Sequence, residues 1–152
     1  MMQKTILKYG SYSLITAALL FLAALVLGKE LDYTTQAALG YLSMVTCLIF
    51  VYFGIKHYRD KENNGVVSFG RALSIGLLIS VFAGIGFGCI DYLYTTVINP
   101  DFMKNYIEAS GEADMPEYSS FSLAAVMFMT VFVIGFIISL ISSLILQRKT
   151  PS

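Results

Sequence analysis

The stretch that decides the fold is residues 118–147, YSSFSLAAVMFMTVFVIGFIISLISSLILQ, whose 30 residues include no charged side chain. A bilayer core about 30 Å thick is crossed by about 20 apolar residues in an α-helix, at a rise of about 1.5 Å per residue. This stretch is therefore long enough to cross a membrane, and we expect the crossing itself at about residues 121–146.

Three further windows have the same character. Residues 9–28, 33–55 and 72–90 also contain no charged side chain. We expect the corresponding membrane spans at about residues 10–28, 34–55 and 70–92. Only helices and closed barrels satisfy their backbone in lipid, and a barrel strand alternates apolar and polar residues. The apolar runs here are continuous, which favours helices.

Composition supports this interpretation and excludes other classes of protein. The 152 residues carry ten Lys and Arg and ten Asp and Glu, and 57% of the residues are hydrophobic. Mean hydropathy is +0.72. A soluble domain needs charge on every element, a disordered chain needs low hydrophobicity, and a nucleic-acid-binding protein needs a basic patch. We therefore expect one all-α integral membrane domain over residues 1–152, a bundle of four transmembrane helices.

The orientation follows from the basic residues, which collect on the cytoplasmic side of short loops. With four spans, eight basic residues fall on the side of the two termini and two on the other side. The eight are Lys4, Lys8, Lys56, Arg59, Lys61, Arg71, Arg148 and Lys149, and the two are Lys29 and Lys104. This asymmetry predicts that both termini are cytoplasmic.

The first window has an alternative interpretation as a cleaved signal peptide. Lys4 and Lys8 precede an apolar run, and Val26-Leu27-Gly28 is an acceptable cleavage site. The apolar run exceeds the 7–15 residues of a typical signal core, which favours an uncleaved span. The mass of the purified protein distinguishes the two.

The outer loop, about residues 99–118, predicts a short interfacial helix. Asn99 is a good helix cap, Pro100 suits the first helical position, and Asp101 complements the helix dipole. We expect this helix to end near Ala109 and to lie on the outer leaflet. Three of its residues would form the apolar face, namely Phe102, Tyr106 and Ile107. Gly111 and Pro116 then favour an irregular connection to the fourth span.

Small residues recur every four positions on the third and fourth spans. The third span has Ala72, Gly76, Ser80, Gly84 and Gly88, and the fourth has Gly135, Ser139 and Ser143. Such faces let helix backbones approach closely in lipid. If the two faces meet antiparallel, we expect Gly84 near Gly135 and Ser80 near Ser139. The alternative is that the same faces bind a second copy of the chain or another membrane protein.

Reactive residues are few, and we assign none to a catalytic, cofactor or metal site. Cys47 and Cys89 should lie at depths about 20 Å apart, which is too far for a disulfide. His57 is the one histidine in the chain and lies in the basic inner loop. A metal site needs several ligands, and no cluster completes a set around it.

Asp91 is the one carboxylate next to a span interior. An ionisable residue inside a membrane is a candidate functional site. However, Asp91 follows 19 uncharged residues and directly precedes Tyr92, so we expect it at the outer interface, in contact with water. Lys29 and Lys104 are its expected charge partners.

Six segments resemble an uncharacterised bacterial membrane family, domain of unknown function 4199. They are residues 8–10, 40–44, 53–61, 68–72, 99–102 and 135–149. The resemblance implies four membrane helices and supplies no activity, substrate or site residue. The outer loop at 107–120 is shorter than in that family. The resemblance also implies that the protein lies in the bacterial cytoplasmic membrane.

From these observations the leading hypothesis is a non-catalytic membrane protein that acts through helix packing or a membrane partner. The alternative is a small transporter or channel subunit working as a homo-oligomer. Its polar groups would come from Asp91, Thr46, Thr130 and the serines of the fourth span. A membrane enzyme is the weakest candidate, because the inner side offers only His57, Asp60 and Glu62 for acid–base chemistry.

Overall fold

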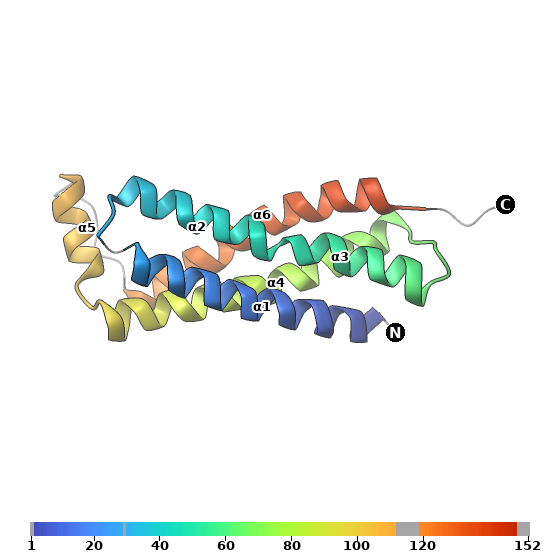
Figure 1. The fold of residues 1–152 in the computed structure, drawn as a ribbon, viewed down its shortest axis with the longest axis horizontal. Coiled ribbons are helices and arrows are strands. Elements are labelled where there is room, and N and C mark those ends of the chain that lie inside the picture. The colour runs from blue at the N-terminus through green and yellow to red at the C-terminus, as the bar shows by residue number, and fades with distance from the viewer. Residues whose placement is uncertain (1, 29, 112–118, 149–152) are drawn as a thin grey trace.

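The computed structural model of the protein describes residues 2–28, 30–111 and 119–148 (Figure 1). The described residues form helices joined by short connections. In chain order the helices are α1 (Met2–Leu27), α2 (Tyr33–Cys47), α3 (Ile49–His57), η1 (Tyr58–Glu62), α4 (Phe69–Leu93), η2 (Tyr94–Ile98), α5 (Phe102–Ser110) and α6 (Ser120–Leu146). The segments η1 and η2 are single π-helical turns that prolong α3 and α4.

Four helical segments within the described residues are long and apolar enough to cross a membrane. They are Gln3–Leu27, Thr34–Glu62, Phe69–Ile98 and Ser120–Leu146. Each segment contains one of the four spans expected from the sequence. The one exception is Gly28, the last residue of the first expected span, which lies just beyond the first segment. The second and third segments run further than expected, because η1 and η2 continue the helices beyond residues 55 and 92.

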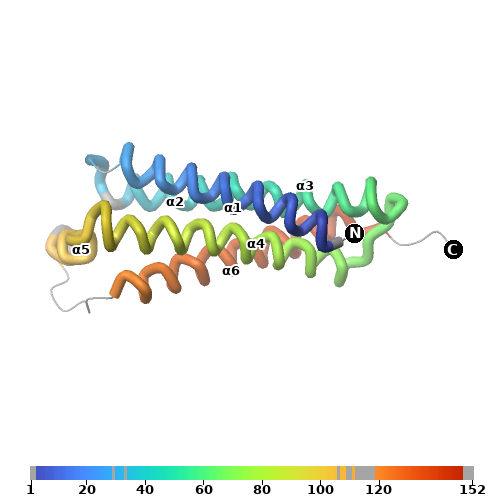
Figure 2. Tube along the Cα trace, turned by 90° about the horizontal axis from the view of Figure 1, so that it is seen from below, coloured from blue at the N-terminus to red at the C-terminus, as the bar shows by residue number. Residues whose placement is uncertain are grey.

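The four segments lie side by side along the long axis of the molecule, each antiparallel to the one before it (Figures 1 and 2). The start of α1 and the end of α6 lie at one end, which we call the terminal end. The short helix α5 lies at the opposite end, which we call the loop end. Helix α4 is central, because it packs against α6, α1 and α3.

The contact between α4 and α6 uses the small-residue faces, as the sequence predicts, but in a different register. A Cβ atom added to Gly76 would lie 2.7 Å from Cβ of Ser139, and one added to Gly135 would lie 2.5 Å from Cβ of Ser80. The expected pairing of Gly84 with Gly135 is therefore wrong by one helical turn, and Gly84 faces Phe128. In the observed register each serine packs on a glycine, whereas the expected register would set serine against serine and leave a gap between glycines.

The second span is broken at Leu48, a feature that the sequence analysis does not predict. The hydroxyl of Thr46 donates to the carbonyl of Leu42 at 2.8 Å, and such local bonds bend helices. Beyond the break, the amide of Val51 donates to Leu48 rather than continuing the α-helical ladder. The hydroxyl of Ser13 on α1 donates to the carbonyl of Cys47 at 3.0 Å and satisfies this interrupted backbone.

The terminal end is closed by hydrogen bonds between the η1 connection and the end of α6. Nη1 of the buried Arg59 donates to the carbonyl of Leu146 at 3.2 Å. The backbones of Val67 and Arg148 form a short antiparallel bridge with N–O distances of 3.0 and 2.8 Å. These contacts give hydrogen-bond partners to backbone groups at the end of α6, where the helix itself leaves carbonyls unpaired.

The helix expected in the outer loop is present, but its start differs from the expectation. It begins at Phe102 after Asp101, and the side chain of Asn99 bonds the hydroxyl of Tyr94 instead of capping it. The ring of Phe102 packs edge-on against Tyr94, with centroids 5.6 Å apart. This residue therefore faces the bundle. Gly111 ends the helix in the left-handed conformation, at φ 73°. Pro116 lies outside the described residues.

Candidate functional site

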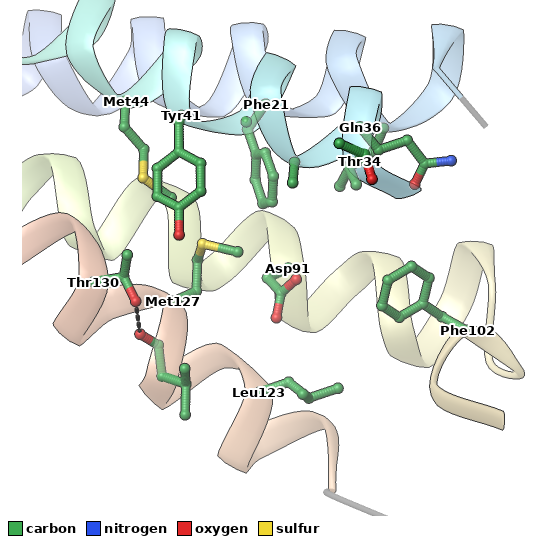
Figure 3. A pocket seen from close by; sticks show the side chains of 14 residues that line it. Phe21, Thr34, Gln36, Tyr41, Met44, Asp91, Phe102, Leu123, Met127 and Thr130 are labelled. Atoms are coloured by element: carbon green, nitrogen blue, oxygen red, sulfur yellow. Dashed lines mark hydrogen bonds between the residues drawn. The ribbon is translucent and has the colours of Figure 1, made fainter. Parts of the chain in front are cut away.

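A cavity of about 610 Å³ lies between the helices in the half of the bundle nearer the loop end (Figure 3). Its walls come from α1, α2, α4, α5 and α6. Most of the lining residues are aliphatic, aromatic or methionine. The lining residues are Phe21, Leu25, Thr34, Gln36, Ala37, Gly40, Tyr41, Met44, Asp91, Phe102, Leu123, Val126, Met127 and Thr130.

Asp91 projects from α4 into this cavity, between the side chains of Phe102 and Met127 (Figure 3). Only 8% of the residue is exposed. Within the described part of the chain, its carboxylate has no hydrogen-bond or ion-pair partner. The ion pairs there join His57 to Glu62 and Arg59 to Asp60.

The expectation of a water-exposed Asp91 at the end of its span is therefore wrong. The span continues for seven residues beyond Asp91, to Ile98, which is about 10 Å at 1.5 Å per residue. Lys104 is exposed and forms no ion pair with Asp91. Lys29, the other expected partner, lies outside the described residues.

The helix continues beyond Asp91 into the π turn η2, where two threonine hydroxyls bond backbone carbonyls one turn back. Thr95 donates to the carbonyl of Asp91 at 2.9 Å, and Thr96 donates to that of Tyr92 at 2.6 Å. The amide of Asn99 then donates to Tyr94 at 2.7 Å, five residues back, which closes the π turn. Single π turns in helices often occur beside functional sites.

Two of the other polar residues that line the cavity, Thr130 and Gln36, donate hydrogen bonds to nearby backbone. The hydroxyl of Thr130 donates to the carbonyl of Val126 at 2.8 Å, the bond drawn in Figure 3. The side-chain amide of Gln36 donates to the carbonyl of Leu31 at 2.9 Å. No Lys, Arg or His is among the lining residues that the structure describes. Asp91 therefore carries the charge chemistry of this site.

The cavity continues sideways between α2 and α6, where the two helices make few contacts. A shallow groove on the outside of the bundle shares Tyr41, Val126 and Thr130 with the cavity and extends along α6 to Ile134. Tyr41 is 54% exposed and Val126 is 62% exposed. The cavity is therefore adjacent to an apolar groove on the side of the bundle.

The start of α2, which borders the cavity at Thr34, is fixed by a cap at Asp32. The hydroxyl of Thr35 donates to Oδ1 of Asp32 at 2.5 Å, and the amide of Thr35 lies 3.4 Å from Oδ2. The hydrogen bond from the Thr35 hydroxyl holds the pKa of Asp32 below its ordinary value of 3.8, because it favours the ionised carboxylate.

The two cysteines and the acid–base residues of the inner loop do not line this cavity. Cys47 is buried and Cys89 is exposed, and both are free thiols, as expected. At the terminal end, Nε2 of His57 lies 3.8 Å from Glu62, while Asp60 binds Arg59 at 2.7 Å. The described residues contain no group of three His, Cys, Asp or Glu side chains able to hold a metal ion.

The polar residues proposed for a transport path also divide into two groups. Thr130 lines the cavity with Asp91. Thr46 points to the backbone of its own helix, and Ser139 and Ser143 are buried, with Ser139 packed against α4. The sequence analysis does not identify Phe21 or Tyr41 as parts of a site. The sequence does not reveal them, because aromatic residues are common in apolar spans and nothing near them in the sequence marks a binding site.

Comparison with known proteins identifies one family. The family described as protein of unknown function (DUF4199) matches residues 8–148. No curated protein and no solved structure matches the chain. Because the match covers nearly the whole sequence, this four-span helical membrane protein belongs to the DUF4199 family.

Proposed function

We propose that the protein is a non-catalytic membrane protein that reversibly binds a small, largely apolar molecule in the cavity around Asp91. One observation carries the proposal: a carboxylate that has no partner among the described residues is 8% exposed and projects into a cavity of about 610 Å³. Small-molecule sites are typically cavities of roughly 300–1,000 Å³ with apolar walls and a few polar groups. Among the described lining residues Asp91 is the one carboxylate and none is Lys, Arg or His, which favours binding over catalysis.

The experiment compares the small molecules that leave the membrane with the protein. Gly40 lines the cavity, and a Cβ added to it meets no atom within 4 Å, so Gly40→Leu fills the cavity. Gly70 is exposed on α4 and equally unobstructed, which makes Gly70→Leu the matched control. We expect mass spectrometry of extracts to find a molecule with wild type and Gly70→Leu that Gly40→Leu lacks. The proposal is wrong if all three proteins carry the same lipids.

We also propose that the protein lies in the bacterial cytoplasmic membrane with both termini inside and α5 outside. Among the described residues, seven basic side chains lie toward the terminal end and Lys104 alone lies at the loop end, which supports this orientation. In a variant without Cys47 and Cys89, a membrane-impermeant maleimide on intact cells should label a cysteine at Asn105 and not one at Lys4. The reverse pattern would overturn the orientation.

The second candidate function is transport, by a small transporter or channel subunit working as a homo-oligomer. Asp91 specifically favours it, because ionisable residues buried within spans often mark substrate paths. The small-residue faces of α4 and α6 already pack on each other within the chain, so a partner subunit would use other surfaces. Flux in proteoliposomes that Asp91→Asn abolishes would support transport, and unchanged flux would remove Asp91 from such a path.

A further inference from the structure

The charge of Asp91 is not balanced by the residues around it. It is the one charged side chain among the cavity residues that the structure describes. An ionised carboxylate in a low-dielectric site is unfavourable until an opposite charge pairs with it. An anionic ligand would add repulsion, and a neutral apolar ligand would leave the carboxylate unpaired. The cavity therefore favours a ligand that brings a positive charge.

The rest of the cavity suits the apolar body of such a cation. The rings of Phe21, Tyr41 and Phe102 come from three different helices and line the same space (Figure 3). Aromatic faces attract cations as well as apolar groups. Met44 and Met127 add flexible, polarisable side chains that adapt to ligands of different shape.

An inorganic ion fits the cavity poorly. Ca²⁺ takes six to eight oxygen ligands and Mg²⁺ takes six, and this site has one carboxylate. The volume of about 610 Å³ is also far larger than an ion needs. An organic cation satisfies both the charge and the volume.

The groove between α2 and α6 supplies the route. The exposed side chains of Tyr41 and Val126 border both the groove and the cavity, on a part of the bundle that would face lipid. Lipid-soluble cations concentrate in bilayers and would reach the cavity from that side.

We propose that this pocket binds a lipid-soluble organic cation, with Asp91 as the counter-ion, and admits it from the bilayer between α2 and α6. The proposal rests on the binding function proposed above and names the class of ligand.

The test uses two probes of nearly the same shape and opposite charge, tetraphenylphosphonium and tetraphenylborate. The full-length protein is placed in nanodiscs of neutral phosphatidylcholine, and equilibrium dialysis measures retention above that of empty nanodiscs. We expect saturable binding of tetraphenylphosphonium, at one per chain, and no retention of tetraphenylborate above the blank. Asp91→Asn should weaken cation binding at least tenfold. Asp101→Asn, at an exposed carboxylate outside the cavity, should leave it unchanged.

Each other outcome overturns the proposal. Equal binding of both probes, equal cation binding by wild type and Asp91→Asn, or no cation binding by wild type excludes Asp91 as a counter-ion for a lipid-soluble cation. The charge comparison on the wild type does not depend on the folding of a variant, and Asp91→Glu should restore part of the affinity. If cation binding fails while Gly40→Leu still loses a co-extracted molecule, the ligand class is wrong and the binding function stands.

Discussion

The register of α4 against α6 predicts strong coupling between Gly76 and Ser139. A Cβ added at Gly76 would lie 2.7 Å from Cβ of Ser139 and 3.1 Å from Cγ1 of Val51. Gly76→Ala therefore overpacks the interface, which typically costs about 1–3 kcal/mol. Ser139→Gly removes the obstructing atoms, so the double variant should lose much less stability than the sum of the two single variants. We expect a coupling free energy of about 1–3 kcal/mol.

The measurement is a double-mutant cycle in mixed micelles, with unfolding by sodium dodecyl sulfate followed by far-ultraviolet circular dichroism. Gly70→Ala is the matched control on the same helix, because a Cβ there meets no atom within 4 Å. Gly70→Ala alone should change stability by less than about 1 kcal/mol. Combined with Ser139→Gly, it should be additive within about 0.5 kcal/mol.

The result that refutes this reasoning is additivity of Gly76→Ala and Ser139→Gly. Additive effects would mean that these residues do not meet. The register expected from the sequence, with Ser80 against Ser139 and Gly84 against Gly135, would then be the correct one. In that case strong coupling should appear between Ser80 and Ser139 instead.

Three further predictions concern the break, the cavity and the cap of α2. Ser13→Ala removes the hydrogen bond to the carbonyl of Cys47 and should lower the free energy of unfolding in the same assay by about 1–3 kcal/mol, because a buried acceptor is left unsatisfied; an unchanged value would show that the break needs no donor. Asp91→Leu should raise that free energy by about 1–3 kcal/mol while it abolishes cation binding, because it removes a buried carboxylate without a partner; a loss of stability would contradict the unpaired state of Asp91. The lowered pKa of Asp32 means that its cap stabilises α2 above about pH 3.8 and is lost as the pH falls through the lower folded pKa. In an NMR titration, Thr35→Val should therefore raise the pKa of Asp32 toward 3.8, and no change would show that the Thr35 hydroxyl does not hold it.

The spans are predictable from the sequence because lipid imposes a simple rule on charge. Windows without charged residues give the positions of all four crossing segments, and only their ends differ. The ends differ because the π turns η1 and η2 continue the second and third helical segments beyond the uncharged windows. Asp91 therefore lies seven residues before the end of its helical segment and is buried in the bundle.

The register of the small-residue faces is not predictable from their spacing alone. A shift of one turn leaves small residues opposite small residues, so the spacing permits several registers. The choice depends on which serine meets which glycine, as Gly76 and Ser139 show, and this is a property of two surfaces together. The cavity is even harder to predict from the sequence, because its walls come from five helices. Its aromatic residues follow no pattern along the chain.

The hydrogen bond from Ser13 to the carbonyl of Cys47 has a consequence for biogenesis. Its donor lies 34 residues before its acceptor, in a span that is synthesised before the span it bonds. When the second span arrives in lipid with its ladder interrupted at Leu48, the group that satisfies it is already in the membrane. This hydrogen bond can therefore form between the two spans before α4 and α6 are synthesised.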